Sequence, residues 1–309
     1  MAPLLGLETA FLPIRQIARV LRPFQYVTNA IRTLALLKAK RPGVIWVQLP
    51  QVPLLTVALQ YKRMFDPTVR IIADCHNRIL NSPWNSWPGL RAQLNSCDAV
   101  VVHNTKVMPK VSALGVRQDL LRLLEDPPAA IRSDARAAHS YPHPWMLFLA
   151  SFNPDEPVEE LLEVARLAPD IHFVLAGDAN RAAGRHDIGR LPENVVLPGY
   201  LTGADLDSAI ASADAILALT KLDDAQLSSA GEAIGAGRPM VLSDTPVTRD
   251  LYYQGGVFVD TFSPESILKG CRAAIEGGAR LAAEALALRE ERYARWRSQA
   301  ESIHEVLAI

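Results

Sequence analysis

The sequence predicts an α/β protein of two domains, each built around a parallel sheet. Short apolar runs alternate with longer amphipathic segments along most of the 309 residues, as repeated strand–helix–strand units require. A segment rich in proline and small residues, 131–144, interrupts this alternation and predicts a linker. The length agrees, since domains commonly have about 150 residues. We therefore expect a small N-terminal domain over residues 1–130 and a second domain over residues 145–290.

The chain opens with a basic amphipathic segment. Residues 7–41 have apolar side chains at helical spacing and basic side chains on the opposite face. We expect the helix to begin near Pro13, because proline is tolerated in a first turn, and Pro23 to divide the region. One interpretation is a helix packed on the sheet with a solvated basic face. The other is a face that contacts anionic lipid or a lipid diphosphate acceptor.

The remaining elements follow from runs of β-branched and aromatic residues and from the amphipathic segments between them. In the first domain we expect strands at 44–47, 69–73, 99–102 and 120–124, and helices at 53–64 and 88–95. In the second domain we expect strands at 145–150, 171–176, 195–197, 215–219, 239–242 and 257–259, and helices at 157–167, 204–213, 229–236, 263–276 and 279–309.

The net charge of −1 is a cancellation between two unequal halves. Residues 1–140 contain 18 Lys and Arg against 8 Asp and Glu, which gives +10, and residues 141–309 contain 14 against 25, which gives −11. The change from positive to negative net charge falls at the proline-rich segment. Such asymmetry indicates different partners for the two domains, or complementary surfaces where they pack.

Several function classes are disfavoured by what the sequence lacks. Cys75, Cys97 and Cys271 are odd in number and far apart, and no CxxC or HExxH motif predicts a metal or disulfide site. No apolar stretch approaches the ~20 residues of a membrane span. No strand is followed by the GxGxxG of nicotinamide-dependent oxidoreductases, and no nucleic-acid-binding motif is present. We expect a cytoplasmic protein with buried, reduced thiols and without a metal or nucleic-acid partner.

The most informative segment is 214–260. Its strand 215–219 ends in a polar loop that leads into a helix beginning with Ser228 and Ser229. Small residues there let backbone N–H groups approach a phosphate, and the helix dipole favours the anion. Glu232, in the first turn, can accept hydrogen bonds from vicinal ribose hydroxyls, and Asp224 can reach a second hydroxylated group. The alternative is that Glu232 only complements the helix dipole.

This stretch resembles the donor-binding half of GT-B-fold glycosyltransferases, in particular the retaining family-4-like enzymes. The shared pattern is Asp224 and Glu232 separated by seven residues, followed by Gly237-Arg238-Pro239 and a short apolar strand. Residues 150–157 resemble the segment that opens the donor domain in a bacterial subgroup. The acceptor domain has strand ends that are similar to residues 73–77, 102–104 and 124–127. The terminal helix with Trp296 resembles the family's last helix.

The resemblance implies two Rossmann-like domains, with residues 291–309 crossing back to the first. It implies transfer of a sugar from a UDP- or GDP-linked donor to a glycan or lipid-linked acceptor, as in surface polysaccharide assembly, without metal or cofactor and with retention. A peripheral contact at the inner face of the membrane would go with a lipid-linked acceptor. For the donor, it assigns Glu232 to the ribose, Asp224 to the donor sugar, Ser228 and Ser229 to the diphosphate, and Gly177 and Asp178, at a strand end, to the base or its loop. Asn153 belongs to the same donor-binding set.

His76 is the candidate for chemistry in the first domain, because it follows strand 69–73 at the carboxyl end, where ligands bind. Its neutral imidazole can hydrogen-bond a sugar or acceptor hydroxyl. The alternative is a packed histidine that supports Trp84 or Trp87. Asp74 either orients His76 or caps the loop, and the sequence context of Asn104 favours a turn former.

The sequence departs from the family in two places. The loop over residues 153–156 lacks the Arg and Lys that clamp the diphosphate, so Lys221 and then Arg249 are the nearest candidate cations. Asp224 is also one methylene shorter than the usual Glu. The chain begins without the expected strand and glycine-rich turn, which predicts a shortened first domain with an uncovered sheet edge. These departures leave a second interpretation, a non-catalytic GT-B protein that serves an active transferase as partner or nucleotide-sugar-binding subunit.

Overall fold

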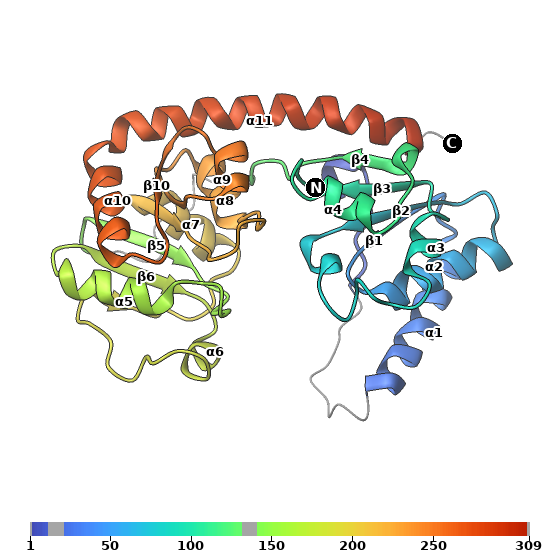
Figure 1. Cartoon of the computed structure of the whole chain (residues 1–309), viewed down its shortest axis with the longest axis horizontal. Helices are drawn as coiled ribbons and strands as arrows, with labels where there is room; N and C mark the ends of the chain where they lie inside the picture. The colour runs from blue at the N-terminus through green and yellow to red at the C-terminus, as the bar shows by residue number, and fades with distance from the viewer. Residues whose placement is uncertain (1, 12–21, 132–140, 308–309) are drawn as a thin grey trace. The chain divides into compact units, whose positions relative to one another are not determined.

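A computed structural model describes residues 2–11, 22–131 and 141–307, and the chain divides into two compact units (Figure 1). The first unit comprises the chain up to Asp126 together with the chain from Trp296 onward, and the second comprises Pro127–Arg295. Pro13, with the expected helix start, and most of the predicted linker lie outside the described residues.

The first unit contains a parallel sheet of four strands in the order β1-β2-β3-β4. The strands are β1 (Val44–Gln48), β2 (Arg70–Cys75), β3 (Ala99–Val102) and β4 (Leu121–Leu123). Each lies within two residues of its predicted bounds. The central strands are apolar on both faces because both faces are covered. Parallel pairing brings the carboxyl ends of all four strands to one edge of the sheet.

Helices cover both faces of this sheet. One core layer packs α2 (Val52–Met64), α3 (Leu90–Leu94) and α4 (Met108–Ala113) against the sheet, with α1 (Arg22–Lys40) beside α2. The opposite layer consists of Leu5 and the end of α11 (Gly278–Leu307), where Trp296, Ala300 and Ile303 pack against β2 and β3. Short 3-10 helices lie at Ala2–Leu5 (η1), Asn77–Leu80 (η3) and Gln118–Leu120 (η4).

The basic N-terminal region agrees with the prediction where it is described. Residues 7–11 are not helical, as a helix start near Pro13 predicts, and the described helix α1 covers Arg22–Lys40. Two of the predicted basic residues have intramolecular partners: Lys40 pairs with Glu8 at 2.9 Å, and Lys38 lies over the ring of Phe65. The ion pair ties residues 7–11 to the end of α1.

The second unit contains a parallel sheet of six strands in the order β10-β9-β8-β5-β6-β7. Its strands are β5 (Trp145–Leu149), β6 (His172–Ala176), β7 (Val195–Val196), β8 (Ala215–Ala218), β9 (Met240–Ser243) and β10 (Gly256–Val259). The chain builds outward from β5 to β7 and then returns to pair β8 with β5. This reversal of direction is the topological switch point, where ligands bind in open α/β sheets.

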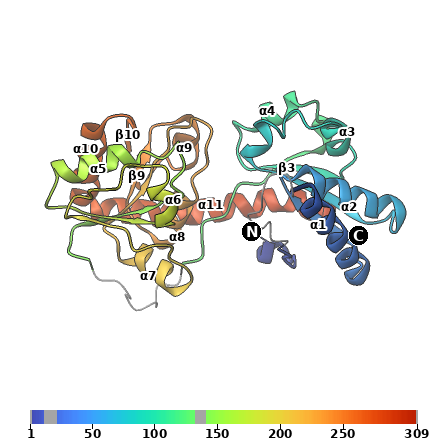
Figure 2. The same cartoon turned by 90° about the horizontal axis from the view of Figure 1, so that it is seen from below.

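Two helical layers sandwich this second sheet (Figure 2). One layer contains α5 (Val158–Leu167) and α10 (Pro264–Glu276). The other contains α7 (Ala204–Ser212), α8 (Ser228–Ala236), α9 (Pro246–Leu251) and the first part of α11. The short α6 (Ala179–Ala183) follows β6. The α/β fold with two parallel sheets and the predicted strands are confirmed, whereas α4, α6 and α9 were not predicted.

The three cysteines are buried free thiols. Burial raises the pKa of each thiol, to about 12 for Cys97 and Cys271. Within the described part of the chain, no helix combines the length and the apolar character that a membrane span requires.

Candidate functional site

The loops that follow β5 and β8 are neighbours, because these strands pair across the switch point of the second sheet. They contain Asn153 in the first loop and Lys221 and Asp224 in the second. The loops are tied together by the backbone of Lys221, which donates to the carbonyl of Asp155 at 2.7 Å, and by the hydroxyl of Thr220, which donates to the Asp155 carboxylate at 3.1 Å. Six of the predicted donor-site residues thus lie on these two loops and on the helix α8 that follows β8.

The start of α8 is open to an anion. Leu227 occupies the N-cap position, and its aliphatic side chain supplies no capping hydrogen bond to the first N–H groups of the helix. Ser228 is exposed and Ser229 is buried. Such an uncapped helix start with small residues is a suitable binding site for a phosphate group.

Glu232 lies one turn further along α8. Its Oε2 atom is buried and has no hydrogen-bond partner among the described residues. Burial, assisted by the nearby charge of Asp207, raises the pKa of this carboxyl above its usual range. Buried polar atoms are rarely left without a partner, because the lost hydration costs about 1–3 kcal/mol. An unsatisfied acceptor beside an uncapped helix start therefore indicates a ligand that brings hydrogen-bond donors.

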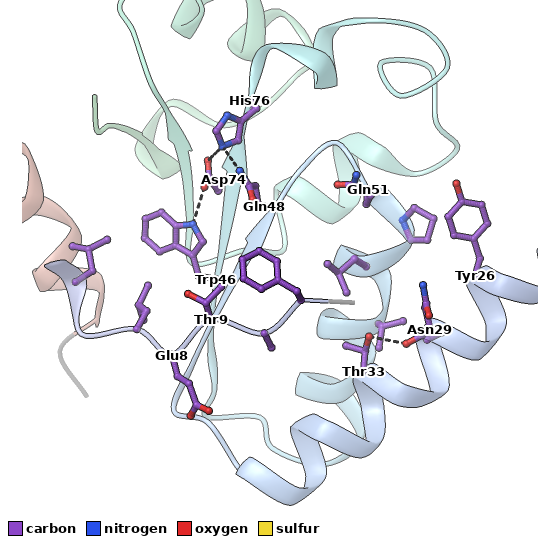
Figure 3. A pocket seen from close by; sticks show the side chains of 18 of the residues that line it. Glu8, Thr9, Tyr26, Asn29, Thr33, Trp46, Gln48, Gln51, Asp74 and His76 are labelled. Atoms are coloured by element: carbon purple, nitrogen blue, oxygen red, sulfur yellow. Dashed lines mark hydrogen bonds and ion pairs between the residues drawn. The ribbon is translucent and has the colours of Figure 1, made fainter. Parts of the chain in front are cut away.

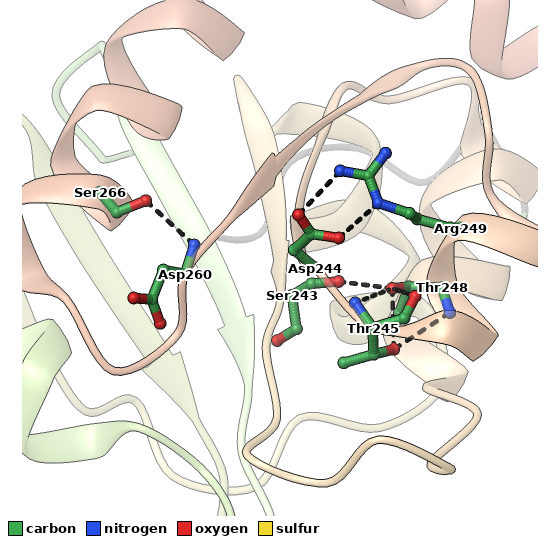
Figure 4. A network of polar contacts seen from close by, with 7 residues as sticks. All are labelled: Ser243, Asp244, Thr245, Thr248, Arg249, Asp260 and Ser266. Carbon is green, nitrogen blue, oxygen red and sulfur yellow. Dashed lines mark hydrogen bonds and ion pairs between the residues drawn. The ribbon is translucent and has the colours of Figure 1, made fainter.

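A buried hydroxyl network fixes the edge of the sheet from which the β8 loop departs. Ser243, at the end of β9, donates to the carbonyl of Thr220 at 2.9 Å and accepts from its N–H at 2.7 Å, while Thr261 donates to the same hydroxyl. Figure 4 shows how Thr248 reaches the Ser243 carbonyl, as part of the capping box that Thr245 and Thr248 form at the start of α9. The network joins the ends of β8, β9 and β10, so the β8 loop has a rigid base.

The candidate cations are distributed differently from the prediction. Lys221 pairs with Glu160 at 2.6 Å, and Arg249 pairs with Asp244 through two hydrogen bonds (Figure 4). The β5 loop, expected to lack a cation, is instead contacted by two arginines. Arg181 donates to the Ser151 carbonyl at 3.1 Å, and Arg185 donates to the Asn153 side chain at 2.8 Å.

These arginines were missed because they follow the next strand, about thirty residues beyond the loop that they contact. The one sequence feature that could have pointed to Arg181 and Arg185 was the Gly177-Asp178 pair, which precedes them in the same loop and helix. Asp178 accepts hydrogen bonds from Asn180 N and Arg181 N and so caps α6. Gly177 lies so close to β5 that a Cβ would be 2.2 Å from the Ala150 carbonyl oxygen. Both residues therefore shape the turn that presents the arginines.

A second polar cluster lies at the carboxyl edge of the first sheet. Its centre is the buried carboxylate of Asp74, which accepts a hydrogen bond from His103 Nε2 at 2.5 Å and one from Trp46 Nε1 at 2.9 Å. His76 Nε2 lies 3.4 Å from the same carboxylate and 2.9 Å from the Gln48 amide nitrogen. Figure 3 shows Trp46, Gln48, Asp74 and His76 converging from β1 and β2.

His103 is a buried cation. Its Nδ1 atom lies 2.9 Å from the carbonyl oxygen of Leu124, and its Nε2 atom faces the Asp74 carboxylate, so both ring nitrogens must donate. Burial lowers the pKa of His103, but the hydrogen bond and charge of Asp74 outweigh burial and raise this pKa to about 9. Burial disfavours the charged carboxylate as well, yet His103 and His76 hold the pKa of Asp74 well below its usual range.

This ion pair predicts a pH dependence of stability. The folded pKa of about 9 lies above the value near 6.5 of an unfolded histidine, so the contribution is complete below pH 6.5 and is lost as pH rises through 9. We expect the free energy of unfolding to fall by roughly 3 kcal/mol over this interval, measured by urea unfolding at several pH values. The variant His103→Asn should lack this decline, and a wild-type curve parallel to that of the variant would contradict the assignment.

The same three side chains are the group that could hold a metal ion among the described residues, since potential ligand atoms of Asp74, His76 and His103 lie within 4.8 Å of one another. The hydrogen bond between His103 and Asp74 uses the nitrogen that would have to coordinate the metal. The ring of His76 stacks near that of His103, with centroids 4.4 Å apart, whereas Trp84 and Trp87 stack on each other. Asn104 accepts from the N–H groups of Lys106 and Val107 and is a turn former, as predicted.

Comparison with known proteins finds a family match within the second unit. Residues 143–276 match the family described as "Glycosyl transferases group 1". Among solved structures, the chain resembles sucrose-phosphate synthase from Thermosynechococcus elongatus, with a TM-score of 0.73 and 15% identity over 96% of this chain and 80% of that one. The chain therefore has the GT-B fold, and residues 143–276 of its second unit resemble the glycosyl transferases group 1 family.

Two further comparisons show how much of the chain resembles known proteins. The GT-B fold recurs in Anabaena HepE, whose structure in complex with UDP-glucose has a TM-score of 0.68 and 15% identity over 90% of this chain and 82% of that chain. A processive diacylglycerol alpha-glucosyltransferase from Acholeplasma laidlawii is 29% identical over 117 residues. That match covers 37% of this chain and only about a third, 32%, of the relative.

Proposed function

We propose that this GT-B protein transfers a sugar from a UDP- or GDP-linked donor to a glycan or lipid-linked acceptor, with retention of configuration and without a metal ion. In this reaction the bond between the sugar C1 and the diphosphate oxygen breaks, and a bond between C1 and an acceptor oxygen forms. The acceptor hydroxyl loses its proton as the diphosphate leaves.

The observation that carries the proposal is the unsatisfied Oε2 of Glu232 beside the uncapped start of α8. A nucleotide supplies what both features lack. Its diphosphate offers anionic oxygens to the N–H groups of Ser228 and Ser229, and its ribose offers hydroxyl donors to Glu232. Asp224, on the adjoining loop, is the candidate contact for the donor sugar. Since HepE binds UDP-glucose on the same fold, a uridine nucleotide is the first donor to test.

The charge of the leaving diphosphate requires compensation, which we assign to the protein. The helix start supplies partial positive charge, and Arg181 and Arg185 bring two full charges to the β5 loop. Lys221 lies in the loop before Asp224, although Glu160 offsets its charge. On the acceptor side, the partly exposed imidazole of His76, positioned by Gln48 and Asp74, is the group placed to hydrogen-bond a hydroxyl.

Thermal unfolding in the presence of UDP, GDP and their glucose and mannose conjugates, with and without Mg²⁺, tests the proposal. We expect one nucleotide series to raise Tm, and the shift to be the same with EDTA as with Mg²⁺. A ligand at 100 times its Kd stabilises the folded state by about 2.7 kcal/mol, which is readily measured. If none of these nucleotides changes Tm, the donor site does not exist as described.

A further inference from the structure

The two sides of helix α1 differ in their surroundings. Its inner side contacts the rest of the first unit, where Thr33 and Leu37 are buried and Leu37 belongs to the core layer that also contains α2. Among the helices and strands, α1 packs chiefly against α2, and Figure 2 shows the two side by side. The opposite side, which we call the outer face of α1, is formed by the exposed side chains Phe24, Val27, Ile31, Arg32 and Lys38.

Three large apolar side chains form a stripe along this outer face. Phe24, Val27 and Ile31 are 71%, 59% and 65% exposed. They recur at intervals of three and four residues, so they lie on the same side of the helix. Single exposed apolar residues are common on protein surfaces, whereas a continuous exposed stripe indicates a surface that contacts a partner.

The charges around the stripe are all of one sign. The sequence of α1 contains two arginines and two lysines and no Asp or Glu. The wider sequence from residue 9 to residue 65 contains nine Lys and Arg and likewise no acidic residue. Arg32 and Lys38 lie on the outer face itself. A surface that combines an apolar stripe with basic side chains is complementary to an anionic lipid bilayer, which has phosphate groups outside and hydrocarbon beneath them.

The same combination continues at the end of α2. The Nζ atom of Lys38 lies 4.4 Å from the centre of the Phe65 ring, so the ends of the two helices adjoin one another. Met64 and Phe65 are 64% and 42% exposed, and the exposed Arg63 precedes them. Apolar and basic side chains therefore extend beyond the outer face of α1 onto the neighbouring helix.

Other occupants fit this surface less well. In a symmetric pair of identical chains, a patch around the symmetry axis contacts its own copy, so basic side chains of both copies would lie close together without an acidic residue of α1 to offset them. A nucleic acid would be attracted by the charge, but its phosphates and sugars give Phe24, Val27 and Ile31 no apolar partner. An anionic bilayer uses both the apolar and the basic side chains.

We propose that the outer face of α1 docks on the surface of an anionic lipid bilayer. The helix lies in the plane of the interface, with Phe24, Val27 and Ile31 below the headgroups and Arg32 and Lys38 at the level of the lipid phosphates. The contact is peripheral, because the inner side of α1 stays packed against α2. The inference goes beyond the proposed transferase reaction and does not depend on it, since these residues belong to the first unit and the donor-site features to the second.

Flotation of the full-length protein with large unilamellar vesicles tests the proposal. One set of vesicles contains phosphatidylcholine and phosphatidylglycerol in equal amounts, and the other contains phosphatidylcholine alone. We expect the protein to bind the mixed vesicles at least about tenfold more tightly, because each basic side chain close to an anionic surface contributes a factor of about five.

Variants of the outer face identify the surface that binds. The double change Phe24→Ser and Ile31→Ser should weaken binding to the mixed vesicles at least about tenfold, because less apolar area enters the membrane. Arg32→Gln should weaken it about fivefold. Leu167→Ser on α5 and Arg297→Gln on α11 are the matched controls, since they change exposed side chains elsewhere and should alter binding by less than about twofold.

Circular dichroism and Tm establish that each variant is folded, and Ile31→Ser alone serves if the double variant is not. The inference is overturned if wild type binds neither kind of vesicle, if it binds both equally, or if the double variant binds as tightly as wild type. Sedimentation equilibrium and titration with a DNA duplex examine the other occupants. A wild-type dimer that the double variant does not form would assign the face to a second copy, and DNA binding that the double variant loses would assign it to a nucleic acid; either result overturns the inference.

Discussion

Replacing Glu232 by alanine is expected to weaken nucleotide binding by about 10- to 100-fold. Each hydrogen bond from a ribose hydroxyl to a carboxylate contributes about 1.5–3 kcal/mol, and every 1.4 kcal/mol is a tenfold change in Kd. The measurement is calorimetric titration with the nucleotide that stabilises wild type most. Glu163→Ala, at an exposed position of α5 where the carboxylate pairs only with Arg166, is the matched control and should leave Kd unchanged.

The same variant distinguishes a binding role from a structural one. Because the buried Oε2 atom of Glu232 has no hydrogen-bond partner in the part of the chain that the structure describes, its removal should not lower the stability of the unliganded protein. We expect the Tm of Glu232→Ala without nucleotide to equal or exceed that of wild type. If the Tm of Glu232→Ala is several degrees lower than that of wild type and the nucleotide affinity is unchanged, Glu232 only stabilises α8.

Replacing Asp74 by alanine is expected to destabilise the protein by about 3–5 kcal/mol. The change removes the counterion of the buried His103, which must then lose its proton or stay buried as an unpaired charge, and breaking one partner of a buried pair carries a penalty of this size. Urea unfolding at pH 6.5 measures it. Asp119→Ala removes the exposed partner of Arg117 and should cost less than about 1 kcal/mol.

The pH profile of the Asp74 variants provides an independent check. Without the carboxylate, burial dominates the environment of His103, so its pKa should fall below that of an ordinary histidine. The decline in stability between pH 6.5 and 9 should then disappear in Asp74→Asn. A cost below about 1 kcal/mol together with an unchanged pH profile would mean that the pair does not hold this edge of the sheet.

The strands were predictable because their signal is local. The apolar runs of β3 and β8 are buried on both faces, so composition alone marks them. The start of α8 was predictable for a similar reason, since Ser228, Ser229 and Glu232 lie within one short segment. The contact that ties residues 7–11 to α1 was not predictable, because an apolar pattern at helical spacing does not reveal that Glu8 pairs with Lys40 across 32 residues.

The cluster around Asp74 was predictable only in part. His76 and Asp74 adjoin one another in sequence, and their position after a strand placed them at the sheet edge. The partner that determines the charge state of Asp74 is His103, which lies on the neighbouring strand and is joined to it only by the register of β2 with β3. Arg181 and Arg185 were missed for the same reason, because side chains that act on a loop from the next strand leave no local spacing pattern.

The most direct test of the central claim is the release of nucleoside diphosphate from the nucleotide sugar that stabilises the protein most, with water as the acceptor. If the second unit is a working donor site, wild type releases diphosphate continuously and Glu232→Ala does so about 10- to 100-fold more slowly at subsaturating donor, as lost binding of about 1.5–3 kcal/mol requires. Release at equal rates by both proteins, or no release by wild type above the enzyme-free rate, would contradict it.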